Sequence, residues 1–250
     1  MIRTSMKFAR PGVANVRFAS SLVAKFEDSV ASLPLREAVR YTTKNMKWTA
    51  NDVKRYADAH ANALLEYGFK SGESIAVVLP DSAEKHVTLL AAAKMGLKVY
   101  DVDTKLSSVA DMRKMLAETK CKAIYFEPTT ETQDNLKLLR KSIPEFFYYD
   151  DSHGQFFHSK HFPALKFFIH TGFDVEQGCL AYKSLFLHHP AESAVDAVLS
   201  GVKDNAPYYA PVTVTGGVTI GAVKTQGEVA ELPAFSFMKK LVSNVYFENP

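Results

Sequence analysis

The sequence predicts an α/β fold in which a mostly parallel β-sheet is flanked by helices. Of the 250 residues, 47% are hydrophobic, so the chain can bury a large core. Segments with the roughly 3.6-residue periodicity of helices alternate with short apolar runs of strand length. Glycine and proline fall between the two kinds of segment, where a helix or a strand has to end.

The clearest helix–strand unit begins at Thr49. Thr49 or Asn51 can cap a helix whose apolar residues repeat on one face, and Gly68 ends this helix. The apolar run 75–79 then predicts a short buried strand, which Pro80 stops. A helix followed by a buried strand is the repeating unit of parallel α/β sheets.

The same alternation continues along the chain and ends in a short β-rich segment and a C-terminal helix. Helices are expected at 82–96, 107–119, 130–142, 190–202 and 234–247, and strands at 97–102, 121–126, 145–150 and 165–170. Residues 204–232 are rich in Gly, Val and Thr and predict paired strands. We therefore expect three parts: a basic arm over 1–28, an α/β domain over 29–187, and a third part over 188–250.

The basic arm has the composition of a mitochondrial transit peptide. It contains five Lys or Arg residues, and no acidic residue precedes Glu27. Small, hydroxylated and apolar residues separate the basic ones, as in such targeting segments. The arm predicts a mitochondrial protein, in the matrix or associated with the inner membrane. A basic tail without a targeting role is the alternative interpretation.

Charge and hydropathy argue against a dedicated nucleic-acid-binding protein and against a membrane-spanning protein. The formal net charge is only +3, with 30 basic against 27 acidic residues, and no basic run could follow a nucleic-acid backbone. No apolar stretch reaches the roughly 18–20 residues of a membrane-spanning helix. We expect no nucleic-acid partner unless the host is a mitoribosome, and no transmembrane segment, although a peripheral membrane association stays open.

Few residues suggest metal or redox chemistry. Cys121 and Cys179 are far apart in sequence and are expected to be reduced and buried. His158 and His161 share a polar, turn-like segment without a Cys, Asp or Glu partner at matching spacing, so no metal site is predicted. His170 ends a strand and is expected at the edge of the core.

A pair of carboxylates, Asp101 and Asp103, stands at the end of another predicted strand. Such a pair could act as acid and base or bind a cation. We favour a structural, loop-capping role for both residues.

Several short motifs between residues 33 and 187 occur in the order and spacing of a known family. They are Trp48-Thr49, Tyr67-Gly68, Gly72-Glu73, the strand ending at Pro80, Lys94-Met95-Gly96 and Val102-Asp103. This region resembles the amino-terminal part of acyl-CoA synthetases and other AMP-forming, adenylating enzymes. The resemblance implies the α/β fold of that part, and none of the matched positions is catalytic in the family.

The resemblance also places a phosphate-binding loop near the end of the chain. The family motif is rich in Thr, Ser and Gly and ends in Pro-Lys-Gly, so that backbone amides, hydroxyls and a lysine surround the triphosphate. The residues of this sequence that correspond to it are Thr215, Gly216, Gly217, Thr219 and Lys224.

Four departures from the family motif predict a degenerate loop. Val218 replaces a hydroxyl residue, Ile220 replaces a glycine, Ala222 replaces the proline, and Lys224 comes one residue late. The family's adenine pocket, ribose-binding acid and catalytic lysine domain have no counterpart in the 26 residues that follow. We therefore expect a pseudoenzyme without a cofactor, in which Gly216-Gly217 turns a β-hairpin.

These observations predict a non-catalytic accessory or structural subunit of a large mitochondrial assembly. A respiratory-chain complex or the ATP synthase is the expected host, with the mitoribosome next, and other protein subunits are the expected partners. Two alternatives stay open: a regulatory module that binds acyl-CoA or a nucleotide, and one half of a split acyl-CoA synthetase.

Overall fold

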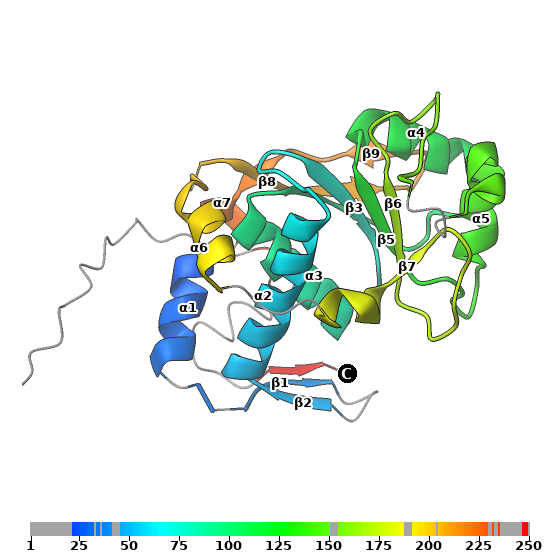
Figure 1. The fold of residues 1–250 in the computed structure, drawn as a ribbon. Coiled ribbons are helices and arrows are strands. Elements are labelled where there is room, and N and C mark those ends of the chain that lie inside the picture. The colour runs from blue at the N-terminus through cyan, green and yellow to red at the C-terminus, as the bar shows by residue number, and fades with distance from the viewer. Residues whose placement is uncertain are drawn as a thin grey trace, which may run out of the picture.

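A computed structural model describes most of the chain. It covers residues 22–32, 34–35, 37–41, 46–150, 155–187, 192–203, 205–229, 232, 235 and 247–249. Residues 1–21, which form most of the predicted basic arm, lie outside the described residues. The fold is α/β, with a mostly parallel sheet between two layers of helices, as the sequence predicts (Figure 1).

The central sheet has eight strands in the order β10-β8-β4-β3-β5-β6-β7, with β9 paired to β8. The six strands from β8 to β7 are parallel, and β9 and β10 run antiparallel to β8. The strands are β3 (Ser74–Val78), β4 (Lys98–Val102), β5 (Ala123–Phe126), β6 (Phe167–His170), β7 (Leu180–Ala181), β8 (Pro207–Thr213), β9 (Thr219–Ile220) and β10 (Lys224–Thr225).

Both faces of this sheet are buried because successive strand residues point to opposite sides. In β3, Ile75 and Val77 belong to one hydrophobic cluster, whereas Ala76 and Val78 belong to the other. The same division holds along β4, β5 and β6. This explains why the strands have continuous apolar sequences without a polar alternate face.

Each face is covered by its own helices (Figure 1). On one side lie α1 (Leu22–Ser32), α2 (Ala50–Glu66), α3 (Ala83–Met95) and α6 (Glu192–Ser200). On the other side lie α4 (Val109–Thr119) and α5 (Asn135–Ser142). The four-residue α7 (Gln226–Val229) follows β10.

The predicted helix boundaries have clear physical causes. Thr49 caps α2 in a capping box with Asp52, in which each side chain accepts the other residue's backbone N–H. Ser82, Ser108 and Asp134 cap α3, α4 and α5 in the simpler way, by accepting one backbone N–H.

Two expected elements differ from the structure. Residues 145–150 were predicted as a strand, but Pro144–Tyr148 forms the 3-10 helix η2. Strand β6 pairs directly with β5, so this segment has no place in the sheet, and Phe147 and Tyr148 point into solvent.

The second difference concerns the chain end. Phe247–Asn249 is strand β11, which pairs parallel with β1 (Glu37–Tyr41), and β1 pairs in turn with β2 (Met46–Thr49). The expected C-terminal helix over 234–247 therefore does not include Phe247, and most of it lies outside the described residues.

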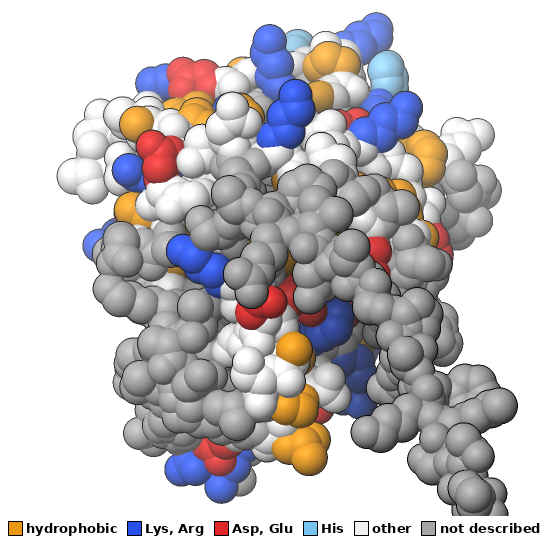
Figure 2. Space-filling model, turned by 90° about the vertical axis from the view of Figure 1, so that its left-hand side faces the viewer, with side chains coloured by type: hydrophobic (Ala, Val, Ile, Leu, Met, Phe, Trp, Pro, Cys, Tyr) orange, Lys and Arg blue, Asp and Glu red, His pale blue; other side chains and the backbone are white. Residues whose placement is uncertain are grey.

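The described side chains carry both signs of charge on one face of the molecule, on the side of α1 and α6 (Figure 2). Lys and Arg side chains occur at its upper and lower ends, with Asp and Glu among them. This mixture agrees with the nearly balanced composition of the chain.

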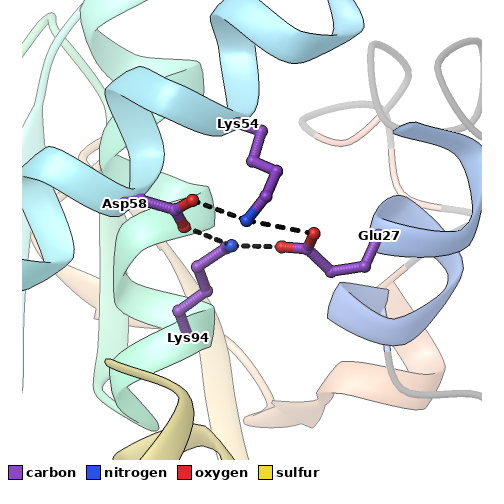
Figure 3. A network of polar contacts seen from close by, with 4 residues as sticks. All are labelled: Glu27, Lys54, Asp58 and Lys94. Carbon is purple, nitrogen blue, oxygen red and sulfur yellow. Dashed lines mark hydrogen bonds and ion pairs between the residues drawn. The ribbon is translucent and has the colours of Figure 1, made fainter. Parts of the chain in front are cut away.

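A network of four charges, two of them buried and two partly exposed, joins the first three helices (Figure 3). The Lys94 ammonium on α3 is bonded to Glu27 of α1 and lies 2.5 Å from Asp58 Oδ1 of α2. Lys54 of α2 completes the ring, with its Nζ 2.6 Å from Asp58 Oδ2 and 3.3 Å from Glu27. Burial alone would lower the pKa of Lys54, but the two carboxylates raise it above its ordinary value. Each charge therefore has an opposite partner within the network.

A second polar cluster lies under α2, where His60 is completely buried. Its Nε2 is 2.9 Å from the Tyr125 hydroxyl and its Nδ1 is 3.3 Å from the Tyr182 hydroxyl. The Tyr182 hydroxyl also donates to the Glu84 carbonyl oxygen at 2.9 Å. Burial lowers the pKa of His60 from 6.5 to about 3, so the ring is neutral at physiological pH.

We expect Lys94→Ala to destabilise the fold by roughly 3–5 kcal/mol, because Glu27 and Asp58 would lose a buried cation. Urea unfolding followed by circular dichroism measures this change. Lys137→Ala, an exposed lysine on α5, is the matched control and should change stability by no more than about 0.5 kcal/mol. Similar losses in both variants would contradict a structural role for the network.

The stability of the protein should fall on acidification below pH 6.5, the unperturbed pKa of His60. Between pH 6.5 and about 3 the unfolded chain binds a proton at His60 that the folded chain does not, so acid favours unfolding. His60→Gln replaces the imidazole with an amide, which can bond the two tyrosines but cannot titrate. Its stability, from urea unfolding at a series of pH values, should depend less on pH, by up to about 1.4 kcal/mol per pH unit. If the free energy of unfolding changed with pH equally in both proteins, His60 would be ruled out as a source of the acid destabilisation.

Candidate functional site

The topology of the sheet indicates where a ligand would bind. In open α/β sheets, ligands bind beyond the carboxyl ends of the strands, near the point where the strand order reverses. Here the chain passes from β3 to β4 on one side and then returns past β3 to β5 on the other. The segments that follow β3 and β5 are therefore the first place to look for a site.

A cavity of about 940 Å³ opens at this edge of the sheet, on the side of α2 and α3. The residues after β5 (127–129) and after β6 (171–174) form its floor. The start of α3, strand β2 and the 3-10 helix η4 (Tyr182–Leu187) form its walls, and these elements can be followed in Figure 1. Its volume is in the range of about 300–1,000 Å³ that small-molecule sites occupy.

The walls of the cavity are mainly aromatic and aliphatic. The rings of Trp48 and Tyr56 lie 4.8 Å apart, and Phe186 meets Tyr56 edge-on at 5.3 Å. Tyr182 contacts Phe186 in the same way at 5.2 Å, and Val87 adds an aliphatic surface. The contacts between rings from β2, α2 and η4 hold the aromatic wall in place.

The polar lining is predominantly acidic. Glu84, Glu127, Asp174 and Glu176 contribute four carboxylates. Lys183 is the single Lys or Arg among the described lining residues, and its Nζ donates to the Phe173 carbonyl oxygen at 3.0 Å. Negative charge and apolar walls therefore occur together in one cavity.

His170 lies close to this cavity but is buried in the sheet, as expected of a residue at the edge of the core. It is 1% exposed, and neither ring nitrogen has a hydrogen-bond partner among the described residues. Burial lowers its pKa below the ordinary value. A Cβ atom at Gly172, in the cavity floor, would come within 3.3 Å of its Nδ1.

The predicted phosphate-loop residues lie elsewhere, at the end of β8. Thr213 pairs with Thr219 across an antiparallel hairpin, and the turn includes Thr215, Gly216 and Gly217. Gly216 and Gly217 have φ values of +75° and +115°, a backbone conformation that favours glycine. The prediction of a hairpin turned by this pair is confirmed.

Local contacts occupy one backbone amide of this turn and bury one of its side chains. The Gly217 N–H donates to the Val214 carbonyl oxygen at 3.2 Å. The Val218 side chain is 3% exposed and packs in the core beneath α4, and its carbonyl oxygen accepts from Lys114 Nζ at 2.9 Å.

Lys224 is also distant from this turn. It lies on β10 opposite Tyr209, four residues before the end of β8. That separation along the strand is roughly 13 Å. The structure therefore does not bring Lys224 together with Thr215, Gly216, Gly217 and Thr219, and whether any of the five binds a ligand stays a prediction.

The remaining candidate residues have structural surroundings. Asp101 accepts from Lys85 Nζ at 2.7 Å and from the Tyr209 hydroxyl at 2.8 Å. Asp103 accepts the backbone N–H of Lys105 and so shapes the loop. Both cysteines are free and buried, as predicted, and burial raises the pKa of the Cys121 thiol to about 11.

The described residues offer neither a metal site nor a membrane span. They include no group of three or more His, Cys, Asp or Glu side chains placed to hold a metal ion. No helix among them is both long enough and apolar enough to cross a bilayer.

The aromatic cavity was missed by sequence reasoning. Phe186 is far from Trp48 and Tyr56 in the chain, and only the fold of β2, α2 and η4 brings the three rings together. The usable signal was the adjacent pair Trp48-Thr49, which was noted as a family motif and helix start rather than as part of a wall.

Comparison with known proteins gives the family. The sequence model of the AMP-binding enzymes matches residues 26–158. The mitochondrial medium-chain acyl-CoA ligase ACSF2 of Pongo abelii is 25% identical over 135 residues, which are 54% of this chain and 22% of that protein. The human ligase of the same name is also 25% identical, over 119 residues that make up 48% of this chain and 19% of that protein. The matches therefore span about a fifth of these relatives.

Solved structures agree with this fold. A putative long-chain-fatty-acid CoA ligase from Rhodopseudomonas palustris superposes with a TM-score of 0.68 over 92% of this chain and 56% of that one, at 14% identity. The anthranilate CoA ligase AuaEII gives 0.65 over 86% and 37% of the two chains, at 16% identity. Since the family match covers more than half of the chain, and its matched elements form the expected sheet and helices, the chain belongs to the AMP-binding enzyme family.

Proposed function

We propose that this chain is a non-catalytic accessory subunit of a mitochondrial protein assembly, built on the amino-terminal fold of an acyl-CoA ligase. The observation that carries the proposal is the hairpin at residues 213–219. Its turn amide at Gly217 is bonded within the hairpin, and Val218 is in the core where the family motif has a hydroxyl group. Adenylation depends on donors and charges aimed at the phosphates, whereas here the Gly217 amide is bonded to Val214 and the Val218 side chain lies in the core.

Two further observations support a role in an assembly. Several large apolar side chains are exposed, although most of the core is well packed: Leu35, Phe147, Tyr148, Phe156, Phe173, Val175 and Leu187. Aromatic side chains on a surface are typical of protein contacts. The mitochondrial location rests on the basic arm and on the names of the matched ligases. A respiratory-chain complex or the ATP synthase is the host that we propose, on the matrix side or at the inner membrane.

A second candidate function is a regulatory module that binds acyl-CoA or a nucleotide, with the turn at Gly216 and Gly217 as its candidate anion contact. One half of a split acyl-CoA synthetase is the third possibility, and it requires a partner chain that supplies the missing phosphate contacts.

Native fractionation of mitochondria tests the proposed assembly. We expect the chain to be imported and to migrate, in blue-native electrophoresis, far above its own mass of 27.8 kDa together with other subunits. Epitope-tagged chain with and without residues 1–21 is the matched pair for import. A species of 27.8 kDa without co-purifying chains would contradict the proposal.

Calorimetric titration with ATP and with an acyl-CoA tests whether the chain binds either ligand. The full chain should give no saturable heat with either ligand, and Lys224→Ala should behave like the unchanged chain. Lys203→Ala, an exposed lysine that precedes β8 at the end opposite the hairpin, is the control for a nonspecific charge effect. Saturable ATP binding that Lys224→Ala weakens and Lys203→Ala does not would favour the nucleotide-binding alternative instead.

A further inference from the structure

The cavity beside α2 and α3 combines two features that select the same kind of ligand. Its wall presents the rings of Trp48, Tyr56 and Phe186, and carboxylates of Glu84, Glu127 and Glu176 lie around the wall. Aromatic ring faces attract cations, and carboxylates do so at longer range. We propose that this cavity is a binding site for an organic cation with an apolar stem, such as an alkylammonium group.

The aromatic wall accounts for the apolar part of the ligand. Ring centroids of Trp48, Tyr56 and Phe186 follow one another at 4.8 and 5.3 Å, so the three rings form one continuous surface. All three side chains are partly buried, which leaves ring surface open to the cavity. Tyr182 lies behind Phe186 and is held by the Glu84 carbonyl oxygen, so the wall does not depend on a bound ligand for its shape.

The carboxylates come from three separate elements and surround the cavity. Glu84 is in the first turn of α3, Glu127 follows β5, and Glu176 lies in the loop after β6. Glu176 forms an ion pair with Arg140, whose Nη2 lies 3.9 Å from the Glu176 carboxylate. With Asp174 added, the described lining residues include four carboxylates and a single ammonium, that of Lys183.

This charge also determines what the cavity rejects. A nucleotide polyphosphate or a coenzyme A phosphate would approach like charges in a partly enclosed, low-dielectric space, where repulsion is stronger than in water. The cavity therefore takes a ligand of the opposite sign to the nucleotides of the AMP-binding enzymes. This inference does not rest on the proposed accessory role, because a subunit of an assembly and a free protein could both carry the site.

Trp48 makes the inference directly measurable, because it is the single tryptophan of the chain and lines the cavity. The full chain is titrated with hexyltrimethylammonium while tryptophan fluorescence is recorded. Hexanol and hexanoate carry the same stem with a neutral and a negative head group. We expect a saturable fluorescence change with the cation and binding at least about tenfold weaker with the other two. Equal responses to all three ligands would overturn the proposal.

Charge-removing variants separate the site from general surface electrostatics. Glu127→Gln and Glu176→Gln should each weaken cation binding by about three- to tenfold. Glu118→Gln, on α4 at the opposite face of the sheet, removes the same charge and should leave binding unchanged. Equal weakening of cation binding in all three variants would show that the net charge of the protein controls binding. That result would overturn the proposed site.

Two measurements keep the test valid if a variant folds poorly. Circular dichroism melting identifies such a variant, and salt dependence is then measured on the unchanged chain. Raising the salt concentration from about 0.05 M to about 0.5 M should weaken binding of the cation but not of hexanol. Salt-independent binding of the cation would contradict the role of the carboxylates.

An alkylammonium group can belong to a free amine or to a lysine side chain of another protein. A short peptide with one trimethyllysine between uncharged residues provides the second arm of the titration. Tighter binding of the peptide than of the free cation assigns the site to a protein side chain, and the reverse assigns it to a small amine. Failure of both ligands to bind would overturn the proposal.

Discussion

The buried ammonium of Lys94 is the constraint on which the helical layer of this protein depends. A lysine that is 1% exposed can stay charged only if carboxylates surround it. Glu27 and Asp58 meet this requirement from two different helices, so α1, α2 and α3 have to pack in one arrangement (Figure 3). The network also determines the candidate cavity, because α2 supplies Tyr56 and α3 supplies Glu84 and Val87 to its walls. A change in the spacing of these two helices would open or close the aromatic wall.

The parts of the fold that could be predicted from the sequence are those with a local cause. The helix that Thr49 caps and the buried strand over Ser74–Val78 follow from capping chemistry and apolar runs. Strand β11 and helix η2 could not be predicted, because their states depend on which distant segments offer a hydrogen-bonding partner. The Lys94 network could not be predicted from the sequence either. Glu27 is 67 residues from Lys94 along the chain, and its only feature in the sequence is that it is the first acidic residue.

The candidate sites show the same limit. The hairpin over residues 213–219 was predicted from paired β-branched residues around two glycines, and the structure has it. The cavity was not predicted, because its rings come from β2, α2 and η4 and its acids from loops that follow separate strands. Motif spacing reports on residues that a family keeps together in sequence. It carries no information on side chains that only the packing of the sheet and helices brings together.

The hairpin and the cavity are the two features behind our proposal that this AMP-binding fold serves without AMP. Both are at the carboxyl edge of the parallel sheet, where this architecture places ligands. At the β8 end, the Val218 side chain lies in the core and the Gly217 amide is bonded within the hairpin. At the β5 and β6 ends, carboxylates surround an aromatic wall and favour positive charge. The sheet and its helices do not depend on either feature, because their stability comes from two buried apolar faces. Under the two proposals, the fold keeps its shape while the electrostatic character of its ligand-binding edge changes sign.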